Sequence, residues 1–131
     1  MTNIQNTLLY QWFQQVWNEN KKESIDTLMD PDAYTHGLAE GELKGSTGFK
    51  FFYDGFTQQF HSIQFTIQHV MQEDDMECAL CTALLTQAET GQTVQISGMT
   101  MAKIENGIIK ESWNSYDFYN MYLQLGYTLQ K

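Results

Sequence analysis

Positive charge is scarce in this 131-residue chain, which has 7 basic residues against 16 acidic ones and a formal net charge of −9. Its lysines form no cluster larger than the pair Lys21–Lys22. Proteins that bind nucleic-acid backbones or anionic membrane surfaces present clustered positive charge. The composition therefore argues against a nucleic-acid partner and against a membrane partner.

Long apolar runs are also missing, since no segment approaches the roughly 18 residues needed to span a bilayer. The opening stretch "MTNIQNTLLYQWF" has no basic segment before its apolar residues and no small-residue cleavage site, so it does not resemble a secretory signal. We therefore expect a cytoplasmic protein.

Cysteine is limited to Cys78 and Cys81 in the stretch "CALC". Alternation predicts a strand here, and residues three apart on a strand lie on opposite faces, about 10 Å apart. A disulfide needs Cα atoms within about 7 Å, and no second cysteine pair completes a zinc site. We expect two buried, reduced thiols and no metal. Glycine-rich phosphate loops and Gly-x-Ser-x-Gly elements are absent too, so we expect no cofactor.

What the chain does have is 42% apolar residues with only 18% charged residues, which suits one globular domain over residues 1–131. Apolar residues recur at helical spacing and predict helices over residues 3–19 and 23–29, the second ending before Pro31. A third helix is expected after Ser46 as its N-cap, with an aromatic stripe that includes Phe52 and Phe56. Such a stripe forms either part of the core or one wall of a ligand site.

The second half of the chain predicts strands, because apolar and polar residues alternate between short turn signals. Short turns join neighbouring strands into an antiparallel meander. A short strand at residues 32–38 and a closing helix at 119–125, stopped by Gly126, complete the pattern. The predicted fold class is α+β, with one curved antiparallel sheet that carries helices on a single face.

The register of the last hairpin can be argued from charge. A two-residue turn at Asn106–Gly107 would place Lys103 opposite Lys110, which is unfavourable. A three-residue loop ending in a left-handed Gly107 avoids this contact. Under that register Met99 faces Trp113 and Met101 faces Glu111. One face of the sheet then holds Met99, Met101, Trp113 and Asp117.

Asp117 lies in the stretch "ESWNSYDFYNMYLQLG", a carboxylate among tryptophan, phenylalanine and tyrosine residues. One interpretation is a cap for the closing helix, because Asp is favoured at helix starts. The other is an acid/base group in an apolar pocket, where desolvation raises the pKa of a carboxyl group. Spacing alone leaves both open.

Two histidines are further candidates. His69 is in phase with the apolar residues of its predicted strand, and His36 lies in the short strand at 32–38. Each is either a core residue or part of a site. The histidines lack the i, i+4 spacing of metal-binding helices, so no metal site is predicted.

The segment "SGMTMAKIENGIIKESWNSYDFYNMYLQLG" resembles the end of SnoaL-like polyketide cyclases, in which a strand, a Gly hairpin, a Trp strand, an Asp and a "QLG" helix follow in this order. Upstream, "KGSTGFKFFYDGFTQQFHSIQFTIQHV" is similar to the third helix and following strand of that family. The resemblance implies the cone-shaped, nuclear transport factor 2-like fold, whose sheet wraps around the N-terminal helices and leaves a deep apolar cavity.

The resemblance also implies cofactor-free acid/base chemistry on a hydrophobic carbonyl compound, such as the aldol ring closure of a polyketide ester. Asp117 matches the acid/base residue of a W-x-x-x-D element, and His36 is the second catalytic candidate. Leu80 departs from the family, which often has an arginine there. The alternative is a non-catalytic module that binds a small molecule. The substrate-binding candidates are Trp113, His69, Met99, Met101, Phe52 and Phe56.

A homodimer is the expected assembly. We expect the face of the sheet without helices to carry Val94, Ile96 and Tyr116 among polar residues. Monomers rarely leave such an apolar surface uncovered. The family resemblance implies dimers as well.

Overall fold

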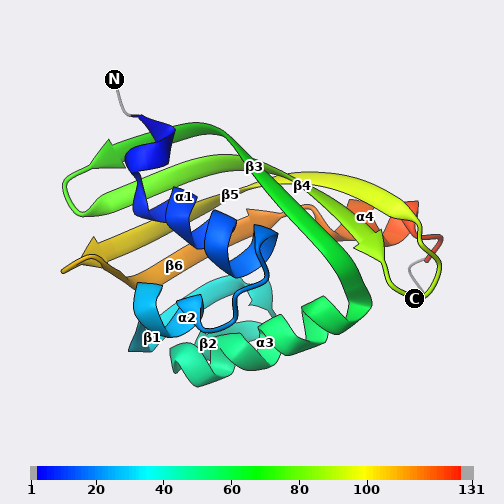
Figure 1. Ribbon diagram of the computed structural model, residues 1–131, viewed down its shortest axis with the longest axis horizontal. Coiled ribbons are helices and arrows are strands. Elements are labelled where there is room, and N and C mark those ends of the chain that lie inside the picture. The colour runs from blue at the N-terminus through cyan, green and yellow to red at the C-terminus, as the bar shows by residue number, and fades with distance from the viewer. Residues whose placement is uncertain (1–2, 128–131) are drawn as a thin grey trace.

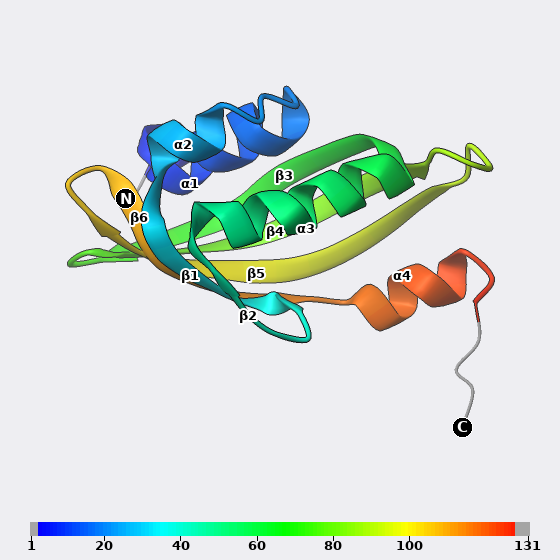
Figure 2. The same ribbon diagram turned by 90° about the horizontal axis from the view of Figure 1, so that it is seen from below.

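The computed structural model describes residues 3–127, and these contain a six-stranded sheet. It curves around α1, α2 and α3, which lie together on one side, called here the inner face (Figures 1 and 2). This confirms the predicted α+β class. The strand order is β2-β1-β6-β5-β4-β3. The strands are β1 (Met29–Ala39), β2 (Gly41–Lys44), β3 (Phe60–Glu73), β4 (Met76–Gln87), β5 (Thr93–Glu105) and β6 (Ile108–Tyr116).

Two details of the sheet differ from the prediction. β1 pairs with β6 in parallel, whereas the other neighbours are antiparallel. β2 was not predicted, because its four residues show too little alternation to signal a strand. It extends the sheet by folding back against β1.

The helix predicted over residues 3–19 consists of three segments. They are a 3-10 turn (Ile4–Asn6), α1 (Leu8–Trp12) and a π-helical turn (Phe13–Asn18). The remaining helices are α2 (Ser24–Leu28), α3 (Gly45–Gln59) and α4 (Phe118–Gln124). None of the helices within residues 3–127 has both the length and the apolar character that crossing a membrane requires.

The N-terminus of α3 differs from the prediction as well. Ser46 lies inside the helix, and the capping position is Lys44, whose side chain makes no capping hydrogen bond. Ser46 is therefore not the N-cap.

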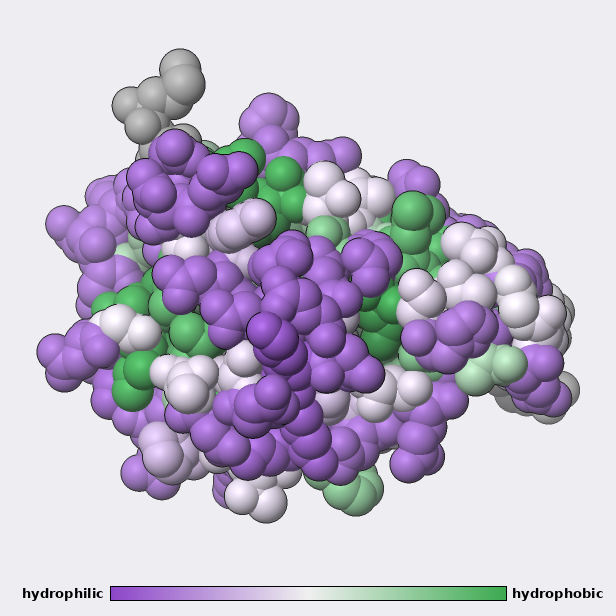
Figure 3. All heavy atoms as spheres, viewed as in Figure 1, coloured by the Kyte–Doolittle hydropathy of each residue, from purple (hydrophilic) through white to green (hydrophobic). Residues whose placement is uncertain are grey.

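The core lies between the helices and the inner face of the sheet. Trp12 packs against Phe49 of α3 with ring centroids 5.0 Å apart, and Phe13 packs against Phe65 of β3 at 4.7 Å. The first helical segment therefore packs against the sheet beside the aromatic stripe of α3. Viewed from the helix side, the surface is mostly hydrophilic and apolar side chains show only in separate patches (Figure 3).

A buried carboxylate joins α1 to the sheet. Both oxygens of Glu77 in β4 accept backbone hydrogen bonds, from Leu8 N at 3.0 Å and from Leu9 N at 2.9 Å. The first N–H groups of a helix have no partner within the helix, and a carboxylate satisfies them while balancing the positive end of the helix dipole. Glu77 therefore fixes where α1 lies on the sheet.

The β5–β6 hairpin has the two-residue turn that the charge argument rejected. Asn106 and Gly107 both have positive φ, at 55° and 77°, as a type I′ turn requires. A bulge after Ile104 and Ile109 then places Lys103 opposite Glu111 instead of Lys110. The predicted three-residue loop is wrong, because the bulge removes the like-charge contact without lengthening the turn.

The observed register pairs Met101 with Trp113 and Met99 with Ser115. Met99, Met101 and Trp113 do share one face, but it is the outer face, which points away from α1, α2 and α3. Val94 and Ile96 are buried on the inner face. The prediction had these two sets of residues on the opposite faces.

The two cysteines are free thiols on opposite faces of β4. Cys81 is buried as predicted, whereas Cys78 is only half-buried. Burial raises the pKa of the Cys81 thiol to about 11, so this group stays protonated at neutral pH.

Candidate functional site

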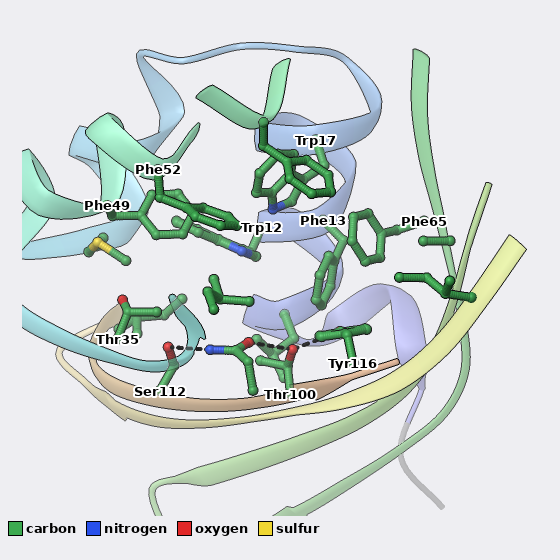
Figure 4. A pocket seen from close by; sticks show the side chains of 18 of the residues that line it. Trp12, Phe13, Trp17, Thr35, Phe49, Phe52, Phe65, Thr100, Ser112 and Tyr116 are labelled. Carbon is green, nitrogen blue, oxygen red and sulfur yellow. Dashed lines mark hydrogen bonds between the residues drawn. The ribbon is translucent and has the colours of Figure 1, made fainter. Parts of the chain in front are cut away.

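A cavity of about 40 Å³ lies between the helices and the inner face of the sheet. Figure 4 shows aromatic side chains from α1, the π-helical turn and α3 above it, and polar side chains of the sheet below it. The aromatic roof comprises Trp12, Phe13, Trp17, Phe49, Phe52 and Phe56. The polar floor comprises Thr35, Thr100, Ser112, Asn114 and Tyr116.

Strand geometry places the floor residues. Successive side chains of a strand point to opposite faces, so in β6 Ser112, Asn114 and Tyr116 point inward while Trp113 and Ser115 point outward. The bulge in the β5–β6 hairpin sets which of these two sets faces the helices. The polar floor was not predicted, because polar residues that alternate along a strand normally indicate a solvated face.

Hydrogen bonds join four of the floor residues in a chain. Thr100 Oγ1 donates to Asn114 Oδ1 at 2.7 Å and lies 2.8 Å from the Tyr116 hydroxyl. Asn114 Nδ2 donates to the carbonyl oxygen of His36 at 3.0 Å and to Ser112 Oγ at 3.3 Å. Because the single proton of Thr100 is given to Asn114, the Tyr116 hydroxyl is the donor to Thr100.

The groups of this hydrogen-bonded network are all neutral. Burial raises the pKa of the Tyr116 hydroxyl far above its ordinary value, so it remains a phenol at physiological pH. The other members are hydroxyls and an amide, which carry no charge. The floor can therefore orient a polar group by hydrogen bonding, but it holds no side chain that titrates near neutrality.

A groove of about 330 Å³ lies beside the cavity and is more open to solvent. It runs along β1 from Gly37 to Glu40 and is closed on the other side by Tyr122 of α4. Four side chains line both the groove and the cavity and so separate them. This aromatic partition consists of Leu38, Phe52, Phe56 and Phe118.

Asp117 lies outside the cavity. Its side chain is exposed, and its carboxylate accepts a hydrogen bond from Asn120 N at 3.0 Å as the N-cap of α4. β6 ends at Tyr116, so the inward position at this end of the strand belongs to Tyr116. The predicted placement of Asp117 in an apolar pocket is wrong, and the capping interpretation agrees with the structure.

His36 and Trp113 meet on the outer face. Their rings stack at 5.7 Å, and His36 Nε2 lies 2.7 Å from Glu111 Oε2. Glu42 Oε2 lies 3.6 Å from His36 Nδ1 on the other side of the ring. His36 thus bridges two carboxylates, and its side chain does not reach the cavity.

His69 is exposed on the outer face because β3 contains a bulge. Ile67 pairs with Cys81 and His69 pairs with Leu80, so one extra residue inverts the alternation between them. Met99 and Met101 lie on the same face, 47% and 39% exposed. None of these three side chains lines the cavity, contrary to their predicted placement.

Phe52 and Phe56 are the two predicted site residues that line the cavity. Their role in binding a substrate stays a prediction. Within residues 3–127, no three His, Cys, Asp or Glu side chains gather in a way that could hold a metal ion.

Changing Asp117 to Asn should alter the free energy of unfolding by less than about 0.5 kcal/mol, because Asn caps helices about as well as Asp. Changing it to Ala should cost about 1 kcal/mol, because the Asn120 N–H then loses its acceptor. Urea unfolding measures both values. If Asp117→Ala also loses less than about 0.5 kcal/mol, the cap contributes nothing to stability.

Comparison with known proteins identifies the family of this chain. The family model described as "SnoaL-like polyketide cyclase" matches residues 7–125. No curated protein matches the sequence significantly.

Solved structures of the same fold include IdmH, a candidate polyketide cyclase from Streptomyces antibioticus, with a TM-score of 0.81, 20% identity and coverage of 92% of this chain and 96% of that chain. A candidate polyketide cyclase from Acidithiobacillus ferrooxidans has a TM-score of 0.79 and 23% identity, covering 95% and 96% of the two chains. AclR from Streptomyces galilaeus, a candidate hydroxylase, has a TM-score of 0.76 and 20% identity, covering 88% and 80%. At these identities the likeness establishes the fold, and the family match over residues 7–125 shows that the chain belongs to the SnoaL-like polyketide cyclase family.

Proposed function

We propose that this protein binds an apolar small molecule in the cavity between the aromatic roof and the polar floor. The observation that carries the proposal is the cavity lining, which is almost wholly aromatic and aliphatic apart from one cluster of polar groups. Small-molecule sites have this composition, in which apolar walls supply affinity and a few polar groups fix orientation.

The size of the cavity determines how a ligand would enter. A volume of about 40 Å³ has room for only a few water molecules, whereas ligand pockets usually measure about 300–1,000 Å³. The groove of about 330 Å³ lies directly behind the aromatic partition. Phe52 and Phe56 are only half-buried, so they can rotate at lower cost than the fully buried Phe49. We propose that their displacement joins groove and cavity into one site.

Binding can be tested with N-phenyl-1-naphthylamine, a neutral apolar fluorophore whose emission rises in apolar surroundings. Phe56→Ala, which opens the partition, should increase its affinity several-fold over wild type. Phe51→Ala is the matched control, because Phe51 is on the same helix and 82% exposed. If neither the wild type nor Phe56→Ala binds the fluorophore, the proposal fails.

Cofactor-free acid/base catalysis on a hydrophobic carbonyl compound is the second candidate, and membership of the polyketide cyclase family favours it. Proton transfer needs a general acid or base within hydrogen-bond reach of the reacting atom. Asp117, adjacent to Tyr116 in the chain, is the proposed group. It would have to release Asn120 N and turn inward around the end of β6.

Enolisation distinguishes the two candidates. When a proton is abstracted from the carbon next to the carbonyl of 1-tetralone in D₂O, deuterium from the solvent replaces it. Proton NMR follows this exchange directly. A catalyst should accelerate exchange, and Asp117→Asn should remove about 10²–10⁴-fold of the acceleration. A wild-type rate equal to that of buffer would leave only the binding function.

The homodimer remains a prediction, and the outer face is the surface we assign to it. Met71 of β3 and Met99 and Met101 of β5 are exposed there, on the two strands that flank β4. We expect the wild type to sediment at micromolar concentration with twice the chain mass of 15.2 kDa. Met101→Glu should sediment as a monomer, because an unpaired charge in an interface is costly. Thr47→Glu, exposed on α3, is the control, and a monomeric wild type would contradict the prediction.

A further inference from the structure

We infer that the hydroxyls of Thr35 and Ser112 form a subsite for a neutral acceptor oxygen, a ketone or ester carbonyl, on the ligand of the cavity. The inference rests on the proposed binding function and identifies the ligand group that the floor recognises. Neither residue was a candidate from the sequence. Each of the two side chains has unused hydrogen-bonding capacity.

Thr35 supplies the first unused donor. Its side chain lines the cavity and is 1% exposed, and no group within residues 3–127 forms a hydrogen bond with its Oγ1. A buried hydroxyl without a partner costs about 1–3 kcal/mol, and a valine of the same shape would avoid that cost. A ligand oxygen in the cavity would accept this proton and remove the penalty.

Ser112 supplies the second donor. Asn114 Nδ2 also donates to the carbonyl oxygen of His36, and this fixes the orientation of the amide. Ser112 Oγ therefore accepts from Asn114, and its own proton is not used in that bond. The chain from Tyr116 through Thr100 and Asn114 thus points its donors toward Ser112, and donors aligned in this way strengthen one another.

The two donors converge on one position. Thr35 and Ser112 are direct partners in the parallel β1–β6 pair, so their backbones lie about 4.8 Å apart and both side chains point to the inner face. One oxygen above the strands can therefore accept from both hydroxyls. Figure 4 shows Phe49 and Phe52 on the opposite side of the cavity, where they would cover the ring system that carries this oxygen.

The chemistry of the subsite selects a neutral group. Within residues 3–127 no lysine or histidine lines the cavity, so a carboxylate there would lose its hydration without gaining a counter-charge. A carbonyl oxygen needs only the two hydrogen bonds that the floor offers. The subsite therefore favours a ketone or ester over the corresponding acid.

The test compares 1-tetralone with tetralin, which has the same rings and a methylene in place of the carbonyl. Dissociation constants for both are measured by NMR titration of wild type, Thr35→Val and Ser112→Ala. Each variant should weaken 1-tetralone about five- to tenfold and leave tetralin unchanged, since one hydrogen bond is lost. The carbonyl carbon-13 signal of bound 1-tetralone should also move upfield in both variants.

Ser115→Ala is the matched control, because Ser115 lies on the same strand and is exposed on the outer face. Thr35→Val removes an unpaired hydroxyl, so the fold should be kept. If wild type binds neither compound, the proposed function fails and this inference with it. If both compounds bind and the ratio of their affinities is unchanged in Thr35→Val and Ser112→Ala, the subsite is wrong and the binding function stands.

Discussion

Replacing Phe49 with alanine is expected to lower the free energy of unfolding by about 3–5 kcal/mol. Phe49 is 2% exposed and lies at the centre of the aromatic roof, with ring centroids 5.0 Å from Trp12 and 6.1 Å from Trp17. Truncation removes these contacts and leaves a larger void above the polar floor. Chemical denaturation followed by tryptophan fluorescence measures the loss.

Phe51→Ala serves as the control for this experiment too, since it removes the same atoms from the same helix. With its side chain 82% exposed, it should change the free energy of unfolding by less than about 0.5 kcal/mol. A loss below about 1 kcal/mol for Phe49→Ala would mean that the helix packs through another face. The pair of variants therefore tests the core independently of any ligand.

Much of the fold follows from periodicity. Apolar residues three and four apart predicted the helical face that carries Trp12 and Phe13, and alternation predicted the long strands from β3 to β6. These signals are strong because each is repeated many times along an element. β2 was not predicted, because a four-residue strand has too few alternating residues to give a clear pattern.

Bulges explain most of what the sequence did not predict. A single extra residue near Gln68 inverts the alternation of β3, and nothing in the residue types marks its position. In the β5–β6 hairpin the avoidance of a Lys103–Lys110 contact was correctly expected. A longer loop and a bulge both avoid this contact, and the residue types do not show which of the two occurs.

The face of each strand was the second source of error. Alternation divides β5 into two sets, Val94 with Ile96 and Met99 with Met101, and both are apolar. Only the register with neighbouring strands shows that Val94 and Ile96 face the helices. The same choice hid the polar floor, because Thr100 lies between Met99 and Met101 and so shares the face of Val94 and Ile96.

The carboxylate among the aromatic residues has a local explanation. Asp117 follows the last residue of β6 and caps α4, a position where Asp is favoured irrespective of its neighbours. Tyr116 fills the inward position that the W-x-x-x-D match assigned to the acid. The residue type at a helix start was therefore a better guide to structure here than the aromatic surroundings.

Gly37→Ala is the second substitution expected to have a large effect, a loss of about 3 kcal/mol in the free energy of unfolding. Gly37 has φ +90°, and a Cβ there would lie 1.8 Å from the carbonyl oxygen of Asn114. The left-handed backbone costs a non-glycine residue about 1–2 kcal/mol, and relieving such a contact costs about 1–3 kcal/mol more. β1 would have to move away from β6, which would separate Thr35 from Ser112.

Gly41→Ala isolates the backbone contribution. Its φ of +79° is similar, but a Cβ there would meet nothing within 4 Å, so this variant should lose only about 1–2 kcal/mol. Urea unfolding of both variants gives the difference in stability, which is the cost of separating β1 from β6.

Gly37→Ala should also break the hydrogen bond from Asn114 Nδ2 to His36 O, which is 3.0 Å long in the wild type. This variant should therefore weaken 1-tetralone binding more than Gly41→Ala does. Equal losses of stability in the two variants would show that β1 and β6 can separate at Asn114 without cost. The close approach of the two strands at Gly37 would then not be needed to keep the polar floor in place.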